Sequence, residues 1–195
     1  RSQIIEARVE AALDARIHLT RGLVSHARLN PTVDSQEFDA FAADLMTQVP
    51  GIRSLQLAPD AVVTFIYPLE GNRAALGHDL RADPKRRPAV EQTIAARDLV
   101  LQGPVTLKQG GTAVIGRTPI FHDVDGREQF WGLAVILLDW EPLMEEAGWP
   151  TGSDIQFALR GKDGKGADGD VIQGEPEVFE RDPVISEIQL PVGHW

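Results

Sequence analysis

Apolar residues recur every three to four positions through the first part of the chain. Residues 2–29 contain no proline and one glycine, Gly22. This spacing predicts one long amphipathic helix, because residues three and four apart share one face of an α-helix. Such a helix could be a stalk or a dimer contact, or it could lie along its own domain. Its apolar positions are Ile5, Val9, Ala12, Leu13, Leu19, Leu23 and Ala27.

A second amphipathic helix is expected after the break at Asn30-Pro31. Asp34 and Glu37 have the spacing of a capping box, in which each side chain accepts a hydrogen bond from the backbone at the start of a helix. The apolar period then continues over residues 38–49, and Pro50-Gly51 ends it. The chain therefore begins with two helices.

From Ile52 the pattern changes to short apolar runs of the kind found in β-strands. Asp83 and Pro84 then have the residue types of a helix cap and a first helical position. We expect a helix from there to about Asp98. Strands are expected at 54–58 and 62–67, which form a hairpin, and at 100–107, 112–121 and 130–140, with a turn at 123–126 between the last two.

The order of these elements indicates an α+β fold, with helices packed on an antiparallel sheet of about five strands. A short linking helix is expected at 141–147. The runs at 154–159, 171–172 and 186–195 predict a second, smaller sheet. Between them, the polar and glycine-rich stretch 161–169 is expected to be an exposed, mobile loop.

Composition and charge exclude several classes of function. The 195 residues carry a formal net charge of −10, which disfavours nucleic acid and anionic lipid as partners. The sequence has no cysteine, so disulfides, thiol catalysis and cysteine zinc sites are excluded. The longest apolar stretch, 133–138, is far shorter than the roughly 20 residues of a membrane-spanning helix.

Several short pieces between Val49 and Phe121 stand in a characteristic order. They are Pro50-Gly51-Ile52, Ala58-Pro59, Tyr67-Pro68, Gly77-His78-Asp79, Arg87, Gly103-Pro104-Val105-Thr106-Leu107, and Gly116 before Pro119. This order and spacing resembles the CHASE family, the extracellular sensory domains of histidine kinases and nucleotide cyclases. The resemblance implies an extracytoplasmic sensor domain of a transmembrane receptor. It also implies flanking transmembrane helices outside this chain and a periplasmic or extracellular location.

The resemblance further implies a domain organisation. We expect a stalk helix at 1–30 and a membrane-distal, PAS-like ligand-binding subdomain at 31–140. The linking helix and an incomplete, smaller membrane-proximal PAS-like subdomain would occupy 141–195. In the full-length receptor we expect a homodimer formed through the N-terminal helix.

In the plant cytokinin receptors that this family includes, a pocket aspartate binds an adenine-like ring, and by spacing it corresponds to Asp79. A leucine whose backbone contacts the ring corresponds to Leu101, and Thr112 is the nearest counterpart of a pocket threonine. Asp79 would accept a hydrogen bond from a ligand N–H, as in a nitrogen heterocycle or an amine. Its alternative role is that of a loop aspartate bonded to its own backbone.

Further wall residues follow from the expected site, because PAS-like sheets bind ligands on the concave face beneath the crossing helix. We expect apolar walls from Val105, Val114 and Phe65 or Tyr67, depending on which strand face points inward. Two cations also lie nearby in the sequence. Arg86 and Arg87 could bind an anionic ligand, or they could form ion pairs, with Arg87 and Asp79 as the natural pair.

No motif points to catalysis, to a metal or to a cofactor. The histidines form no His-x-x-x-His set. Asp123, Asp125 and Gly126 resemble the start of a calcium loop that lacks its terminal glutamate, so a hairpin turn is expected instead. The sequence therefore favours a sensor that binds a small molecule over an enzyme. The alternative is a structural module that dimerises a receptor and transmits its signal without a ligand of its own.

Overall fold

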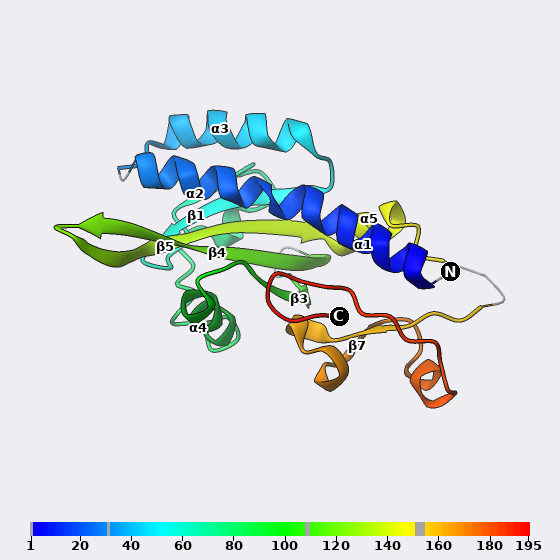
Figure 1. Ribbon diagram of the computed structural model, residues 1–195. Helices are drawn as coiled ribbons and strands as arrows, with labels where there is room; N and C mark the ends of the chain where they lie inside the picture. The colour runs from blue at the N-terminus through cyan, green and yellow to red at the C-terminus, as the bar shows by residue number, and fades with distance from the viewer. Residues whose placement is uncertain (1, 31, 108–109, 151–154) are drawn as a thin grey trace.

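The computed structural model describes residues 2–30, 32–107, 110–150 and 155–195, and its centre is a five-stranded antiparallel sheet (Figure 1). The strand order is β2-β1-β5-β4-β3. The first strand therefore lies beside the last, which joins the two ends of the expected PAS-like subdomain into one sheet. The strands are β1 (Ile52–Pro59), β2 (Phe65–Tyr67), β3 (Val100–Thr106), β4 (Thr112–Val124) and β5 (Arg127–Asp139).

The longest strands, β4 and β5, form a hairpin in which Ala113 pairs with Asp139 and Val124 with Arg127. Asp125 and Gly126 have φ angles of 53° and 74°, and the Gly126 N–H donates to Asp123 Oδ1 at 2.9 Å. The expected hairpin turn is confirmed. These aspartates therefore serve the turn, as Asn, Asp and Gly commonly do.

One face of the sheet is covered by α1 (Ser2–Ile17), α2 (Leu19–Leu29) and α3 (Ser35–Gln48) (Figure 1). The single helix expected over 2–29 is divided at His18, whose backbone keeps helical angles. Side chains there bond to backbone carbonyls, from Thr20 Oγ1 to Ile17 O at 2.6 Å and between His18 Nδ1 and Asp14 O at 2.6 Å. The expected cap of α3 is confirmed, because Asp34 Oδ1 accepts from the N–H groups of Gln36 and Glu37.

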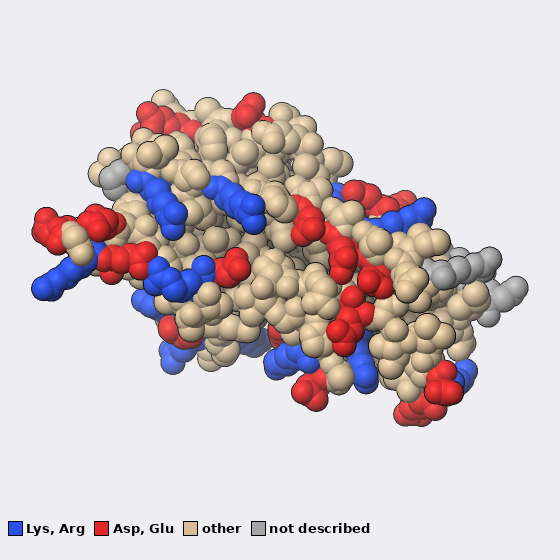
Figure 2. Space-filling view, in the orientation of Figure 1, with Lys and Arg blue, Asp and Glu red and all other residues tan. Residues whose placement is uncertain are grey.

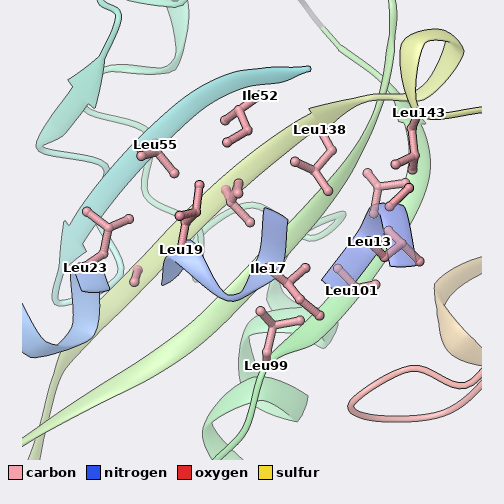
Figure 3. Packing of buried hydrophobic residues seen from close by; sticks show 14 of the residues in the cluster. Leu13, Ile17, Leu19, Leu23, Ile52, Leu55, Leu99, Leu101, Leu138 and Leu143 are labelled. Carbon is pink, nitrogen blue, oxygen red and sulfur yellow. The ribbon is translucent and has the colours of Figure 1, made fainter. Parts of the chain in front are cut away.

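The apolar stripe of α1 and α2 is buried against the sheet. Leu13, Ile17 and Leu23 meet Leu55 and Leu138 in one cluster, as Figure 3 shows. Burying each such side chain contributes about 1.5–3 kcal/mol. The N-terminal helices therefore lie along their own domain, as one of the two interpretations expects.

The outward side of α1 carries negative charge. Glu6, Glu10 and Asp14 follow one another at intervals of four residues, and acidic side chains gather over this helix in Figure 2. Residues four apart lie on the same helical face. A second copy that packed against the same face would therefore bring like charges together.

The opposite face of the sheet is covered by α4 (Arg87–Ala96) and by the segment 60–86, which contains a short 3-10 turn at Arg73–Ala75. The helix expected to start at Pro84 starts three residues later, with Pro88 in its first turn. A helix that began at Pro84 would place Pro88 inside it, where the ring clashes with the carbonyl four residues earlier. Asp83 instead caps a separate turn, in which Asp83 Oδ1 accepts from the Lys85 N–H at 2.8 Å.

The C-terminal part begins with α5 (Trp140–Glu146) and contains a two-stranded sheet, β6 (Leu159–Arg160) and β7 (Val171–Gln173). The strand expected over 186–195 is wrong. The Leu190 N–H donates to Gly193 O at 3.2 Å, so this segment turns back on itself and forms only isolated bridges. The first position of the strand expected at 154–159 lies outside the described residues.

The glycine-rich stretch 161–169 is not an exposed loop. It forms short 3-10 turns at Lys162–Gly164 and Gly166–Asp168, and both Gly161 and Gly166 are buried. Backbone bonds join it to the end of the chain, with Gly166 N to His194 O at 2.9 Å. The absence of side chains on these glycines permits this close approach of two backbones. None of the helices in the described ranges is both long and apolar enough to cross a membrane.

Candidate functional site

The two faces of the five-stranded sheet differ in chemistry. Paired residues of antiparallel strands lie on the same face, so the register assigns each side chain to a layer. The face beneath α1–α3 is apolar. Leu55, Ile136 and Leu101 lie in one row across it, on the strands β1, β5 and β3. The opposite face carries four buried polar side chains, which are Ser54, Gln56, Gln102 and Arg117. Buried polar groups are costly unless they are paired, so this face has a role beyond packing.

Apart from β2, which pairs with β1 in the sheet, the segment 60–86 forms a cover over the polar face. The Val63 N–H donates to His78 O at 3.0 Å, and the Gly77 N–H donates to Val63 O at 2.7 Å. These bonds hold the two ends of the segment side by side. Its buried apolar side chains, Ala61, Val63 and Leu80, point to the sheet and pack with Val135 and Leu137 in one cluster. The cover consists of turns and a short pairing rather than of long regular elements.

A cavity of about 60 Å³ lies between this cover and the sheet. At about 10–15 Å³ for each water-sized probe, it has room for roughly four or five non-hydrogen atoms. Its walls are apolar, from Val63, Ala74, Ala75, Leu80, Leu107, Ile115, Val135 and Leu137, and its polar lining comes from Gln56, His78, Arg86 and Arg117. Mostly apolar walls with a few convergent polar groups are typical of a small-molecule site.

Arg117 is the most unusual group in this lining, because its guanidinium is 1% exposed. Its Nη1 donates to Gln102 Oε1 at 2.9 Å, while its Nε lacks a partner among the described residues. Burial, together with the nearby charge of Arg86, lowers the pKa of Arg117 to about 9, although Asp163 and Asp83 act in the opposite direction. Arg117 therefore remains charged at neutral pH.

The rim of the cavity is organised around Asp83. Its Oδ2 lies 2.8 Å from His78 Nε2, and its Oδ1 accepts from the Lys85 N–H. The bond from the Lys85 N–H, with a further contribution from His78, holds the pKa of the Asp83 carboxyl below its usual range. Gln102 Nε2 also donates to Lys85 O at 3.0 Å. The sheet, the cover and the residues directly before α4 thus meet at this cavity.

Asp79, the expected ligand acceptor, is exposed and does not line the cavity. Its Oδ1 accepts from the N–H groups of Arg81 and Ala82, both at 2.9 Å. It thus performs the alternative role, bonding to its own backbone. The expected ion pair between Arg87 and Asp79 is wrong, because Arg87 Nε donates to Arg81 O at 2.6 Å.

The other expected site residues do not line the cavity. Phe65, Tyr67, Leu101 and Val114 pack in the apolar cluster beneath α1–α3, and Thr112 shares that face by alternation along β4. Val105 packs with the cavity-side cluster but does not line the cavity. Because successive strand residues point to opposite faces, the cavity is lined by neighbours of the expected residues, such as Ile115.

The residues that sequence reasoning missed are Gln56, Gln102 and Arg117. Gln56 lies between Leu55 and Leu57, while Gln102 follows Leu101 and Arg117 follows Val114-Ile115-Gly116. A single polar residue among apolar strand residues usually indicates the solvent face of a sheet. One such residue in each of β1, β3 and β4 was the available signal.

A larger groove of about 460 Å³ lies between the start of α1 and the C-terminal part. Its lining is mainly apolar and includes Ile5, Trp149, Phe157 and Val184. It has no counterpart of the buried guanidinium of Arg117, so the smaller cavity is the better candidate. In the described ranges, no three His, Asp or Glu side chains lie close enough together to hold a metal ion.

Comparisons with known proteins identify related folds. The chain matches the extracellular ligand-binding receptor from Desulfohalobium retbaense, with a TM-score of 0.66 at 11% identity over 89% of this chain and 30% of that one. It also matches two Pseudomonas aeruginosa PAO1 chemoreceptor domains. PctC in complex with GABA gives 0.58 at 20% identity over 81% of this chain and 69% of that one, and PctB in complex with L-Arg gives 0.60 at 19% over 98% and 81%.

These likenesses show the fold, an α+β architecture with a long N-terminal helix and an antiparallel PAS-like sheet, as the sequence predicts. The chain spans less than a third of the length of the Desulfohalobium protein. No curated protein sequence matches it significantly. The CHASE domain model matches residues 59–172, more than half of the chain, including the cover, α4 and most of the sheet. The chain therefore belongs to the CHASE domain family, whose members are sensory domains on the extracellular or periplasmic side of the membrane.

Proposed function

We propose that this domain is the sensor of a membrane-anchored receptor and that it binds a small molecule in the cavity beneath the segment 60–86. The observation that carries the proposal is the cavity itself, which lies between an irregular cover and a sheet face with buried polar groups. The similar Pseudomonas domains bind GABA and L-Arg, which are small molecules. The receptor would be a histidine kinase or a nucleotide cyclase.

A ligand can shift a conformational equilibrium only by binding one state more tightly than the other. The cover is suited to this, because few backbone bonds join its two ends and its apolar side chains close over the cavity. A ligand that contacts both the cover and the sheet would favour the closed state. The difference between the binding free energies of the closed and open states would then shift the receptor towards the closed state.

A contiguous set of contacts leads from the cavity towards the C-terminal part. Arg117 bonds to Gln102 of β3, and the next residue, Gly103, donates its N–H to Asp163 Oδ1 at 2.7 Å. We expect ligand binding to slow backbone hydrogen exchange over 161–173 in the wild type and not in Asp163→Ala. Equal protection in both proteins would show that the signal does not pass through this bond.

A dimer through the N-terminal helix is part of this proposal for the full-length receptor. Most of its apolar stripe is buried in the domain, so the contact would depend on exposed apolar residues such as Ile4 and Leu29. Crosslinks between cysteines placed at Ile4 in the two copies would support it. Crosslinks confined to other surfaces would contradict it.

The test of the proposed site is a cavity-filling substitution. Ala75 lines the cavity from the cover, and Ala75→Leu would place three more carbons in it. Ala96→Leu is the matched control, because Ala96 is exposed on α4. The three proteins would be screened by thermal denaturation against a panel of metabolites with molecular masses below that of a dipeptide.

We expect at least one compound to stabilise the wild type and Ala96→Leu but not Ala75→Leu. At a concentration one hundred times Kd the stabilisation is about 2.7 kcal/mol, or roughly 5–10 °C for a domain of this size. Equal shifts in all three proteins would place the site elsewhere. If no compound binds the wild type, the alternative of a structural module that transmits a signal without its own ligand is favoured.

A further inference from the structure

The cavity contains a positive charge that the described part of the chain leaves uncompensated. Arg117 is buried and charged, yet among the described residues its only hydrogen-bond partner is the neutral Gln102. It forms no ion pair with a described carboxylate. Charged groups are almost never fully buried unless they are paired. The unpartnered Nε and the remaining guanidinium protons therefore leave capacity for an acceptor.

A second cation faces the same space. Arg86 lines the cavity, is half-buried and forms no ion pair with a described residue. The two guanidinium groups are near enough for the charge of Arg86 to lower the pKa of Arg117. Two like charges that share a small cavity repel each other, and an anion between them would remove that repulsion.

The acidic groups nearby are occupied by other partners. Asp83 accepts from the Lys85 N–H and pairs with His78, and Asp163 accepts from the Gly103 N–H. Both attract Arg117 through space, as the direction of their effect on its pKa indicates. Neither is within hydrogen-bonding reach of its guanidinium in the described structure. Among the described residues no carboxylate is left to complete Arg117, so an acceptor from a bound molecule would fit there.

The rest of the lining restricts the chemistry of that acceptor. Val63, Leu80, Ile115 and Val135 present apolar surface, which suits a short aliphatic group. A guanidinium matches the planar geometry of a carboxylate through two parallel hydrogen bonds. Inorganic oxyanions share the charge but would leave the apolar walls without a partner. The volume limits the molecule to roughly four or five non-hydrogen atoms.

We propose that the ligand of this cavity is a short-chain aliphatic carboxylate, held by Arg117 with Arg86 as a second cation. The inference rests on the proposed function, because it names the ligand class of the same cavity. It assigns the cavity an anionic ligand in place of the N–H donor expected from the family resemblance. It also gives Arg117 a specific role, since the charge is retained in the core for the ligand.

The test compares sodium propionate with propionamide, which has the same shape and no charge, at constant ionic strength. Binding would be measured by thermal denaturation and calorimetry. Arg117→Met removes the charge and keeps an apolar side chain in the core. Arg127→Met is the control, because Arg127 is exposed at the β4–β5 turn. Arg86→Gln tests the same site at a half-buried position, so that the proposal remains testable if Arg117→Met does not fold.

We expect saturable stabilisation by propionate in the wild type and in Arg127→Met. Propionamide should have no effect, and Arg117→Met and Arg86→Gln should each weaken propionate binding at least tenfold. Equal responses to propionate and propionamide, or full binding by Arg117→Met, would overturn the inference. Binding of phosphate or sulfate in place of propionate would overturn the carboxylate assignment.

The two proposals fail in distinguishable ways. If an uncharged compound stabilises the wild type and Ala75→Leu abolishes that effect, the cavity is a ligand site but its ligand is not an anion. If propionate binds equally to the wild type and Ala75→Leu, the anion site lies outside the cavity and the carboxylate inference fails. The proposed function fails when the compounds that bind the wild type bind Ala75→Leu equally well, or when no compound binds the wild type.

Discussion

Arg16 of α1 and Glu146 of α5 form an ion pair that joins the N-terminal helix to the helix that leads into the C-terminal part. The guanidinium is 1% exposed and the carboxylate 48% exposed. Arg16 Nη1 also donates to Ala12 O at 2.7 Å, and its Nη2 contacts the second oxygen of Glu146. One buried charge thus has its compensating carboxylate on a distant element, in contrast to Arg117.

Glu146→Gln should destabilise the domain by about 1–2 kcal/mol, because a buried guanidinium loses its charged partner. The value is at the low end for a buried charge, since the exposed carboxylate is screened by solvent. Urea denaturation would measure it. Glu145→Gln is the control, because Glu145 is exposed and lies next to Glu146 in α5. Equal losses in the two variants would mean that the ion pair contributes nothing specific.

The same pair predicts a pH dependence. The hydrogen bond from Arg16 lowers the pKa of Glu146 below its ordinary value of 4.5. In the unfolded chain the carboxyl takes up its proton at a higher pH, so the pair stabilises the fold above pH 4.5. That contribution disappears as the pH falls through the folded-state pKa. Urea denaturation at several pH values below 5 should show the wild type losing more stability than Glu146→Gln. Parallel curves for the two proteins would contradict the assignment.

Gly51 lies against Arg16 and has a φ angle of 79°. A Cβ at this position would come within 2.9 Å of Arg16 Nη2. Gly51→Ala should therefore cost more than the roughly 1–2 kcal/mol of left-handed backbone strain alone. Gly71→Ala separates the two effects, since Gly71 has a φ of 75° and nothing within 4 Å of the added carbon. Thermal unfolding of both variants would test this, and an equal loss of stability would show that the contact with Arg16 is relieved at no cost.

Local signals predicted the elements that local interactions determine. The cap at Asp34 and the turn at Asp125 and Gly126 depend on bonds within a few residues, and both are present as expected. The helix expected at Pro84 failed because a second proline, Pro88, competes for the first turn. The strand expected at the end of the chain failed for another reason, because residues 188–195 turn back on themselves and also bond to the distant stretch 161–169.

The candidate site was difficult to predict because it depends on a second layer over the sheet. A single polar residue among apolar strand residues, as at Gln56 and Arg117, is also the pattern of a strand with one solvated face. The segment 60–86 covers both residues, and between its expected strand at 62–67 and the helix expected from Pro84 it has neither a helical nor a strand period. The family resemblance pointed to the same part of the chain as the cavity, and the register of the strands decides which side chains point into the cavity.

Asp79→Asn tests the role that the family resemblance implies. Asparagine keeps the oxygen that accepts from the Arg81 and Ala82 N–H groups, so the turn should persist. Because Asp79 is exposed outside the cavity, we expect the affinity for a cavity ligand to stay within about twofold of the wild type, well below the tenfold that 1.4 kcal/mol represents. A loss of affinity of about ten- to a hundred-fold, which corresponds to one charged hydrogen bond, would show that Asp79 binds the ligand after all. Calorimetry with whichever compound binds the wild type gives the answer.

Arg117→Met should stabilise the domain in the absence of ligand. An apolar side chain of similar length would fill the space of a buried charge that lacks an ionic partner among the described residues. Replacing buried charges by well-packed apolar residues is often neutral or stabilising by about 1–4 kcal/mol. Urea denaturation without added anions measures this, with Arg127→Met expected within about 0.5 kcal/mol of the wild type.

The combination of results decides the role of Arg117. Higher stability together with lost propionate binding would mean that the charge reduces the stability of the fold and is retained for the ligand, as in other sites where function opposes stability. A loss of about 3–5 kcal/mol in Arg117→Met would instead indicate that the guanidinium has a partner within the fold, because breaking a buried charge pair has that cost. In that case the bond to Gln102 would belong to a structural network, and Arg86 would be the remaining candidate to bind the anion.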